Sequence, residues 1–250
     1  MKSSCPVCPS SDAFHIYDYG KATEHGHCFS CGYHKFSEAT QHLEELTKAN
    51  ERHMKDIAAT VPLTLPVGSE KRIDVKALQW LDKYDIIRDE IIANDIRWSD
   101  PYHWLVFPIK QNGQLVGTIS RVFPKLGQTP EDIKPKWIGK GPLGNINYFV
   151  GTSIGKKSNI VLVEDIVSAI KVGRQTRAMP LFGSHLSPKR LMWLHGATDK
   201  VVFWLDRDKW HESIKFAKSC ALVGLVTQVL YTDKDPKECT NEEIFNLISL

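Results

Sequence analysis

Two C-x-x-C pairs near the N-terminus constrain the fold more than any other feature of the sequence. Cys5-Pro-Val-Cys8 and Cys28-Phe-Ser-Cys31 are separated by 19 residues, which is typical of a zinc site with four thiolate ligands. The intervening segments alternate enough to form short strands. The sequence therefore predicts a zinc-binding ribbon over residues 1–36, a unit too small to fold without its metal.

Other uses of the cysteines stay open as alternatives. A redox pair or disulfides would use the same four thiols, but the N-terminus has no apolar stretch of the signal-peptide type, and this favours metal over oxidation. His15, His25 or His27 could replace one cysteine as a ligand, which would leave that cysteine spare. We interpret the remaining Cys220 and Cys239 as buried structural thiols.

The composition is that of a globular protein with room for two or three compact units. The chain has 250 residues, 42% of them hydrophobic, and a formal net charge of +3. No apolar run is long enough to span a bilayer, so we expect a cytoplasmic protein with no membrane partner. The net charge is too small to predict nucleic-acid binding, so local clusters of residues have to decide that question.

A helix and a linker are expected over residues 37–70. Apolar residues recur at near-helical spacing and end before Pro62, and the prolines and glycine of residues 60–69 indicate an extended connector. In the next segment, 71–150, residues 74–98 have the pattern of a helix that packs on other elements. Residues 104–109 and 115–122 then predict a β-hairpin that turns at Asn112-Gly113.

Basic residues gather after this hairpin. Five of them lie between Arg121 and Lys140, including Lys136, against two acids. They form either a solvated basic loop or a surface that holds triphosphates and template phosphates. Residues 151–158 superficially suggest a phosphate loop, but the glycine-to-lysine spacing is wrong, and we interpret them as a turn.

Residues 151–250 alternate strands and helices, which predicts an α/β unit with a parallel sheet. The expected strands are 159–163, 179–182, 200–205 and 227–231, and the expected helices are 165–172, 188–194, one that starts near Trp210 and one that opens with the capping box 240–243. Acids follow three of the strands, at the sheet edge where α/β proteins bind ligands. They are Glu164, Asp206, Asp208, Asp233 and Asp235.

These acids predict a cation site. Asp206 and Asp208 are two apart, so on an extended chain their carboxylates point to the same side, and Glu164 arrives from a neighbouring strand. Converging carboxylates repel one another unless a divalent cation joins them, and Mg²⁺ suits oxygen ligands and substrate phosphates. The alternative is that each acid merely caps the helix that follows it.

Three groups of residues resemble known families. Val161-Leu-Val-Glu164, Trp204-Leu-Asp206-Arg-Asp208 and Asp233-Lys-Asp235-Pro-Lys-Glu238 resemble the acidic motifs of the TOPRIM domain, and residues 181–187 are similar to the segment between those motifs in primases. Residues 107–138 resemble the basic half of the DnaG-type RNA polymerase core. With the four-cysteine ribbon, the order matches the primase half of bacteriophage primase-helicases along nearly the whole chain.

The resemblance implies an α/β fold with an N-terminal zinc ribbon, then an α+β basic subdomain over residues 71–150 and a TOPRIM parallel-sheet subdomain over residues 151–250. It implies a DNA primase, a nucleotidyltransferase that copies single-stranded DNA into short RNA primers for DNA replication. Cys5, Cys8, Cys28 and Cys31 would hold one structural zinc ion. Glu164, Asp206 and Asp208 would hold one or two Mg²⁺ ions, or Mn²⁺, with Asp235 as a further catalytic acid.

The same resemblance implies that Arg121, Lys136 and Lys140 bind nucleotide and template. The sequence shows no counterpart of the helicase half of the phage proteins. If the chain is complete, we expect a separate replicative helicase and a DNA polymerase as partners of a phage-encoded protein in a bacterial cytoplasm; the alternative is a fragment excised from a longer protein. The sequence departs from the TOPRIM pattern at Asp165, where a glycine is usual, and at Ser168, where an acid is usual.

Two alternative functions stay open. A TOPRIM nuclease would share the acids and would cut DNA with no triphosphate present. A non-catalytic single-stranded-DNA-binding protein would bind DNA without metal and make no product.

Overall fold

The computed structural model describes residues 2–18, 24–31, 33–35, 63–151, 159–183 and 185–249. The chain divides into two compact units, Met1–Val61 and Pro62–Leu250. The expected helix within residues 37–60 and the turn expected at 151–158 lie, apart from Gly151, outside the described residues. In the described ranges no helix is both long and apolar enough to cross a lipid bilayer.

The described part of the first unit is a small antiparallel sheet, as expected for the zinc-binding ribbon predicted from the sequence. Its strands, in the order β1-β2-β3-β4, are β1 (Lys2–Ser3), β2 (Phe14–Asp18), β3 (Glu24–Cys28) and β4 (His34–Lys35). Among the residues whose burial is described, its buried cluster contains Cys5, Phe14 and Cys28, with Cys8, Ala13 and Tyr33 packed at its margin. Because half of these six residues are predicted metal ligands, the metal site and the core of the ribbon are the same place.

The second unit begins with a five-stranded antiparallel sheet in the order β5-β6-β7-β8-β9. Its strands are β5 (Ser69–Glu70), β6 (Arg97–Ser99), β7 (Trp104–Gln111), β8 (Gln114–Val122) and β9 (Trp137–Lys140). The predicted hairpin is confirmed: β7 pairs with β8, and Asn112 and Gly113 turn the chain with φ of 51° and 78°. Two positive φ angles in succession are what a two-residue hairpin turn requires.

The segment predicted as helical, residues 74–98, is two short helices and a strand. α2 (Val75–Lys83) and α3 (Arg88–Ala93) are followed by β6. Asp85 and Asp95 have φ of 56° and 50°, and this left-handed conformation ends each helix. The basic segment also differs from a loop in part, because Trp137–Lys140 form β9. Two short 3₁₀ turns flank β9: η1 (Pro130–Asp132) and η2 (Leu143–Asn145).

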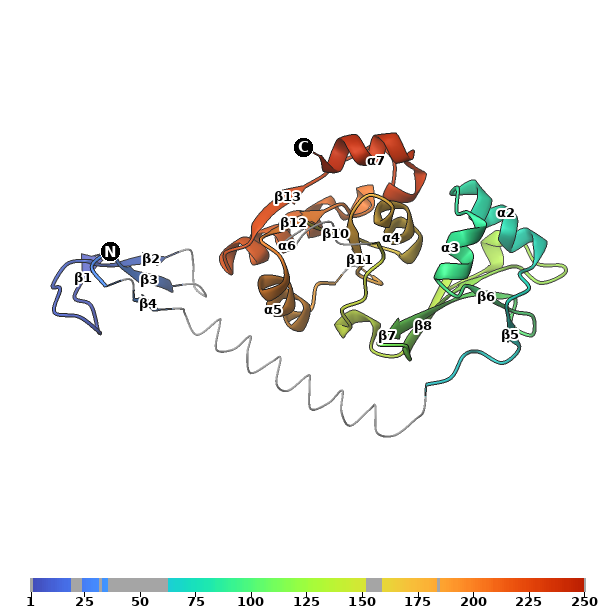
Figure 1. Ribbon diagram of the computed structural model, residues 1–250, viewed down its shortest axis with the longest axis horizontal. Helices are drawn as coiled ribbons and strands as arrows, with labels where there is room; N and C mark the ends of the chain where they lie inside the picture. The colour runs from blue at the N-terminus through green and yellow to red at the C-terminus, as the bar shows by residue number, and fades with distance from the viewer. Residues whose placement is uncertain are drawn as a thin grey trace. The chain divides into compact units, whose positions relative to one another are not determined.

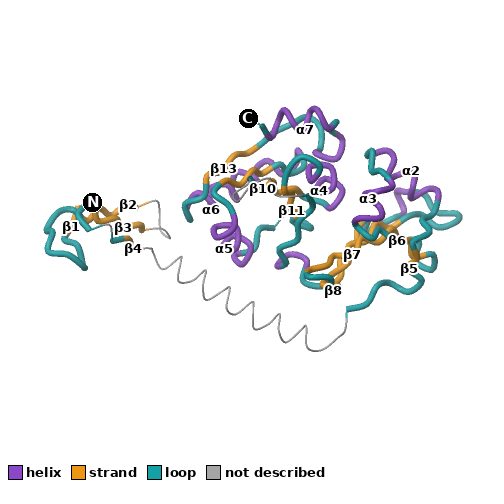
Figure 2. Tube along the Cα trace, in the orientation of Figure 1, coloured by secondary structure: helices purple, strands orange, loops and turns teal. Residues whose placement is uncertain are grey.

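A four-stranded parallel sheet follows, in the order β11-β10-β12-β13 (Figure 2). Its strands are β10 (Ile160–Val163), β11 (Arg177–Pro180), β12 (Lys200–Phe203) and β13 (Val226–Val229). The helices are α4 (Ile166–Gly173), α5 (Pro188–Ala197), α6 (Trp210–Leu222) and α7 (Asn241–Ile248), with 3₁₀ turns η3 (Arg207–Lys209) and η4 (Pro236–Glu238). The predicted α/β alternation is confirmed, with β11 and β13 shifted by one or two residues.

Alternate residues of β10 pack on the two faces of this sheet. Ile160 and Leu162 belong to a cluster with residues of α5 and α6, whereas Val161 and Val163 belong to a cluster with residues of α4 and α7. Helices therefore cover both faces, which explains why the strand is apolar at every position.

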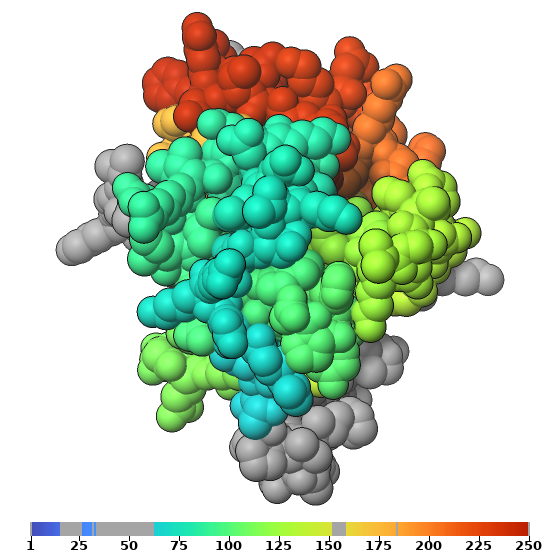
Figure 3. Space-filling model, turned by 90° about the vertical axis from the view of Figure 1, so that its right-hand side faces the viewer, coloured from blue at the N-terminus to red at the C-terminus, as the bar shows by residue number. Residues whose placement is uncertain are grey.

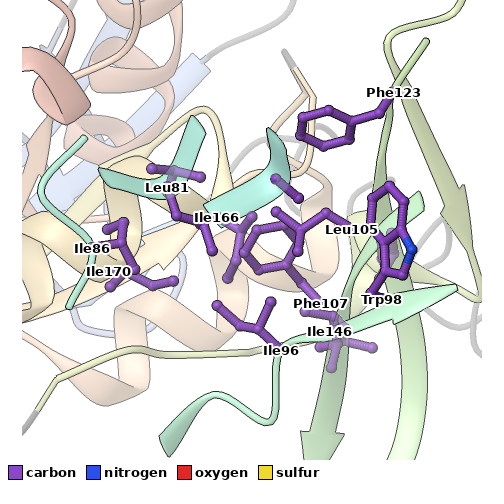
Figure 4. Packing of buried hydrophobic residues seen from close by; sticks show 14 residues of the cluster. Leu81, Ile86, Ile96, Trp98, Leu105, Phe107, Phe123, Ile146, Ile166 and Ile170 are labelled. Atoms are coloured by element: carbon purple, nitrogen blue, oxygen red, sulfur yellow. The ribbon is translucent and has the colours of Figure 1, made fainter. Parts of the chain in front are cut away.

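α4 is shared between the two sheets of the second unit. Ala169 and Val172 face the parallel sheet, whereas Ile166 and Ile170 enter the cluster formed by α2, β6 and β7 (Figures 1 and 4). Figure 4 shows Ile166 and Ile170 among Leu81, Ile86 and Phe107. One hydrophobic cluster thus draws on both sides of the predicted boundary at residues 150 and 151, and that boundary stays a prediction.

Two arginines strengthen the same junction. The Arg190 side chain is fully buried and donates hydrogen bonds to the carbonyls of Leu143, Ile146 and Leu181. Arg174, at the end of α4, binds the carboxylates of Glu90 and Asp85 and the side-chain oxygen of Asn241. Arg174 thus links α3 and the second residue after the end of α2 to the first residue of α7, and Figure 3 shows the face of the molecule on which the teal and red segments are seen.

Candidate metal centres and nucleotide site

The four predicted zinc ligands converge. The sulfur atoms of Cys5, Cys8, Cys28 and Cys31 all lie within 4.8 Å of one another. Two of the distances, from Cys5 to Cys31 and from Cys8 to Cys28, are 3.7 Å. Tetrahedral coordination with Zn–S bonds of about 2.3 Å places sulfurs about 3.8 Å apart. The geometry therefore fits one zinc ion and needs no histidine ligand.

Electrostatics at this site also favour a metal. Burial opposes ionisation of Cys5, but the backbone N–H groups of Val7 and Cys8 outweigh it and lower the thiol pKa to about 6. The backbone N–H of Tyr33 has the same effect on Cys31, but burial and the three other cysteines raise its pKa to about 12. Four thiols this close cannot all ionise alone, and a bound cation removes that conflict.

An aromatic group lies exposed on the ribbon. Phe29 is 63% exposed, and its ring contacts the imidazoles of His15 and His27 edge-on, with centroids 4.8 and 4.5 Å away. His15 and His27 are opposite each other on β2 and β3. Phe14, in contrast, belongs to the buried cluster. Phe29, His15 and His27 thus form a group of flat side chains of the kind that can stack on an unpaired base.

The predicted acids gather at the carboxyl edge of the parallel sheet. Glu164 follows β10, and Asp206 follows β12 after two further residues; the two strands are neighbours, with Leu162 opposite Phe203. Burial, and next the charge of Asp206, raise the pKa of Glu164 to about 7. Burial also raises the pKa of Asp206 to about 6, although Lys237 opposes the shift. Both carboxylates therefore lie in a partly desolvated place where negative charge accumulates.

Two oxygen atoms at this edge are buried without a hydrogen-bond partner: Oε2 of Glu164 and Oδ1 of Asp206. Leaving a buried carboxylate oxygen unpaired is costly, and such atoms in a native structure are explained by an ion or a water. Carboxylate oxygens are the ligands that Mg²⁺ prefers. The residues present therefore fit a divalent cation held by Glu164 and Asp206.

The expected geometry of Asp208 is wrong. Asp206 is the N-terminal cap of η3, so Asp208 lies in a 3₁₀ turn and not on an extended strand. Its side chain is 73% exposed and pairs with Lys209 at 3.2 Å. Among the described residues, one group of at least three His, Cys, Asp or Glu side chains is close enough together to hold one ion, and it consists of the four cysteines. Asp208 is thus near the edge, since its charge acts on Glu164, but stands apart from the buried pair.

Asp235 and Asp165 belong to a second group that the sequence did not reveal. Both bind the ammonium of Lys237, which also binds Asp206. No local pattern marks Lys237, because its three partners come from positions 165, 206 and 235 and meet only in the folded chain. Asp165 also caps α4 through the amides of Val167 and Ser168.

The three predicted basic residues differ in burial: Arg121 is half-buried, whereas Lys136 and Lys140 are exposed. Arg121 is half-buried, with its guanidinium 5.6 Å from the ring centres of both Trp80 and Trp137. Burial lowers its pKa, whereas the charges of Tyr84 and Asp165 act in the opposite direction. Arg121 therefore lies on the face of its sheet that carries Trp137 and contacts Trp80.

Lys136 and Lys140 are both exposed. Trp137 pairs with Arg121 and Lys140 pairs with Thr118, so strand alternation places Lys140 on the opposite face of the sheet from Arg121. The structure does not bring Arg121 and Lys140 together. Lys136 directly precedes Trp137 and accepts a hydrogen bond from Val122 through its backbone carbonyl.

The fold and its sites define a class of protein: a four-cysteine ribbon in one chain with an α/β unit whose parallel sheet carries acids at its carboxyl edge. One solved structure similar to this chain is the crystal structure of the Aquifex aeolicus primase, comprising its zinc-binding and RNA polymerase domains. The TM-score is 0.57 at 16% sequence identity, and the match covers 99% of this chain and 78% of that one. At this identity the likeness shows the fold.

The sequence itself matches no protein-family model and no curated protein.

Proposed function

We propose that the chain is a DNA primase that synthesises short RNA primers on a single-stranded DNA template. The observation that carries the proposal is the pair of buried, unpartnered carboxylate oxygens of Glu164 and Asp206, on a fold shared with a primase. A phosphoryl-transfer enzyme needs a cation at such a place. On this proposal residues 151–250 are a TOPRIM domain, and the protein is phage-encoded.

In the proposed reaction, the 3′-hydroxyl oxygen of the growing strand attacks the α-phosphorus of a ribonucleoside triphosphate. The bond to the β-phosphate breaks, pyrophosphate leaves, and the hydroxyl proton passes to water. Bound Mg²⁺ or Mn²⁺ would stabilise the charge on the attacking and leaving oxygens. Glu164 and Asp206 would hold the cation, the exposed Asp208 would complete its ligands, and Asp235 would act through Lys237.

The basic residues have a binding role in this proposal. Arg121 is backed by two tryptophan rings, which restrict its guanidinium and suit it to a bidentate contact with a phosphate. Lys136 and Lys140 would hold phosphates of the triphosphate or of the template, and Lys140, on the opposite face of the sheet from Arg121, fits template phosphates better. Phe29 and its two histidines would stack on template bases. A separate helicase and DNA polymerase would complete replication.

The test is primer synthesis with purified, zinc-loaded protein on random-sequence single-stranded DNA, with labelled ribonucleotides and Mg²⁺. Wild type should make short oligoribonucleotides, and Asp206→Asn should lower the yield at least about 100-fold. Asp233→Asn is the matched control, because Asp233 is a largely exposed acid after the neighbouring strand and should keep full activity.

Other outcomes have definite meanings. Degraded DNA with no triphosphate present would favour a nuclease with the same acids. Bound but unchanged DNA, in Mg²⁺ and in Mn²⁺, would contradict the primase and favour a non-catalytic binding protein.

A further inference from the structure

Lys237 lies at the centre of the acidic edge. Its Nζ atom is 2.9 Å from Oδ2 of Asp165, 3.1 Å from Oδ2 of Asp206 and 3.0 Å from Oδ2 of Asp235. The side chain is only 15% exposed. The ammonium donates hydrogen bonds to Asp165 and Asp206 and forms an ion pair with Asp235, so three carboxylates share the three N–H donors of this group.

The residues around Lys237 are themselves held in place. Oδ1 of Asp165 accepts hydrogen bonds from the backbone N–H groups of Val167 and Ser168. This fixes the carboxylate with Oδ2 directed toward the Lys237 ammonium. Asp235 caps η4, where the buried Pro236 precedes Lys237. The lysine therefore reaches its partners from a short, anchored turn, and a surface ion pair between long flexible side chains would lack this restraint.

The two oxygens of Asp206 have different surroundings. Oδ2 is bound to Lys237, whereas Oδ1 is buried and has no partner. The other unpartnered oxygen, Oε2 of Glu164, lies at the end of the neighbouring strand, and, after burial, the charge of Asp206 raises the pKa of Glu164 more than the charge of any other carboxylate does. Asp206 thus lies between two groups of acids. Asp165 and Asp235 already bind the Lys237 ammonium, whereas Glu164 keeps an unpartnered oxygen although the charge of Lys209 opposes the rise in its pKa.

We propose that Lys237 is a built-in cation that fills one of two cation positions at this edge, so that the chain binds a single divalent ion at Glu164 and Asp206. Two-metal centres place their ions about 3.5–4 Å apart around a shared carboxylate. Here Asp206 is the shared carboxylate, and the ammonium stands where the second ion would stand. The inference rests on the proposed function, and it makes Lys237 a positioning residue that acts through Asp206.

Charge explains why the two cations would exclude each other. Asp165, Asp206 and Asp235 surround the ammonium, and in this partly buried place a dication arriving at the same oxygens would be repelled by the lysine. The lysine cannot dissociate from the chain, so its position stays filled at any Mg²⁺ concentration. Replacing Lys237 by an apolar residue should leave three unscreened carboxylates and therefore open the second position.

The test is direct metal binding to the zinc-loaded full chain, with Mn²⁺ as the probe and electron paramagnetic resonance and calorimetry as readouts. Wild type should bind about one Mn²⁺ and Lys237→Met about two, the second within spin-coupling distance of the first. Lys237→Arg keeps the charge and should bind one. Glu164→Gln should weaken the wild-type site at least about tenfold.

A single ion bound by Lys237→Met, with an affinity within about twofold of wild type, would overturn the proposal. If this variant does not fold, Asp165→Asn/Lys237→Met restores the local charge balance, and asparagine still caps α4. The double variant should again bind a second ion, and one ion alone would count against the lysine's role.

Primer synthesis measured on the same samples separates the two proposals. Wild type that binds one ion but makes no primers would contradict the primase and leave the role of Lys237 standing. Active wild type with a Lys237→Met variant that gains no ion would contradict only the role of Lys237.

Discussion

At the scale of single residues, Asp95 shows how one acid is held ionised. Its carboxylate accepts hydrogen bonds from Lys110 at 2.7 Å and from Arg97 at 3.1 Å. Burial alone would raise the pKa of Asp95, but these two cations outweigh it and hold the pKa below its usual value. Asp95 also has a φ of 50°, which asparagine adopts as readily as aspartate. Asp95→Asn therefore removes the charge and little else.

We predict that Asp95→Asn lowers the free energy of unfolding by about 1 kcal/mol near neutral pH. A folded-state pKa below the unfolded one gives stability that is present above the unfolded pKa of about 3.9 and is lost as the pH falls through the folded pKa. The difference between variant and wild type should therefore vanish in acid. Urea unfolding at several pH values measures it, with Asp82→Asn, at an exposed site of α2, as control. A difference that is the same at every pH would contradict the ion pair.

Residue patterns located the acids but not their geometry. The order of strands predicted Glu164 and Asp206 at one edge, and they lie there. The prediction that Asp206 and Asp208 share a face assumed extended chain, whereas the chain turns into η3 at once. Lys237 could not be found this way, because its environment exists only after three distant segments have packed together.

At the scale of elements, the C-terminal ends of the helices depend on backbone conformations that the hydrophobic pattern does not predict. α2, α3 and α6 each end with the same pair of backbone hydrogen bonds, in which a residue in left-handed conformation is followed by an apolar residue bonded to the last turn. In α6 that residue is Gly224, which the sequence would suggest, whereas in α2 and α3 it is an aspartate. Aspartate is less common there, and the segment 74–98 therefore resembled one long helix.

Two glycines, Gly196 within α5 and Gly224 two residues after the end of α6, allow the cost of a left-handed residue at a helix end to be tested. Gly224 has a φ of 87°, whereas Gly196 lies within α5, and a Cβ atom at either position would meet no neighbour within 4 Å. Gly224→Ala should lower the free energy of unfolding by about 1 kcal/mol because of backbone strain alone. Gly196→Ala, the control, should be neutral or stabilise by up to about 1 kcal/mol. Equal effects in thermal or urea unfolding would rule out the conformational explanation.

At the scale of the whole molecule, the two units depend on different forces. Three hydrophobic clusters stabilise residues 63–249, whereas two of the three buried residues in the ribbon cluster are cysteines of the predicted zinc site. The sequence predicted this contrast, because the cysteine spacing fixes a metal site and long apolar strands fix a sheet core. It could not predict that α4 would pack against both sheets, since this depends on which sheet each face of the helix contacts in the folded chain.

Removing zinc should therefore unfold one unit and spare the other. Structural zinc contributes about 10–16 kcal/mol in small zinc domains, far more than a cluster of three side chains supplies. We predict that a chelator lowers hydrogen-exchange protection of β2 and β3 at least about 100-fold, because their folded state requires the metal, while β10 and β12 keep theirs. Cys8→Ser should reproduce the loss, whereas Cys220→Ser, in α6, should leave the ribbon unchanged. Ribbon protection that survives complete removal of zinc would show that this unit folds by packing alone, and loss of protection in both units would show that they unfold together.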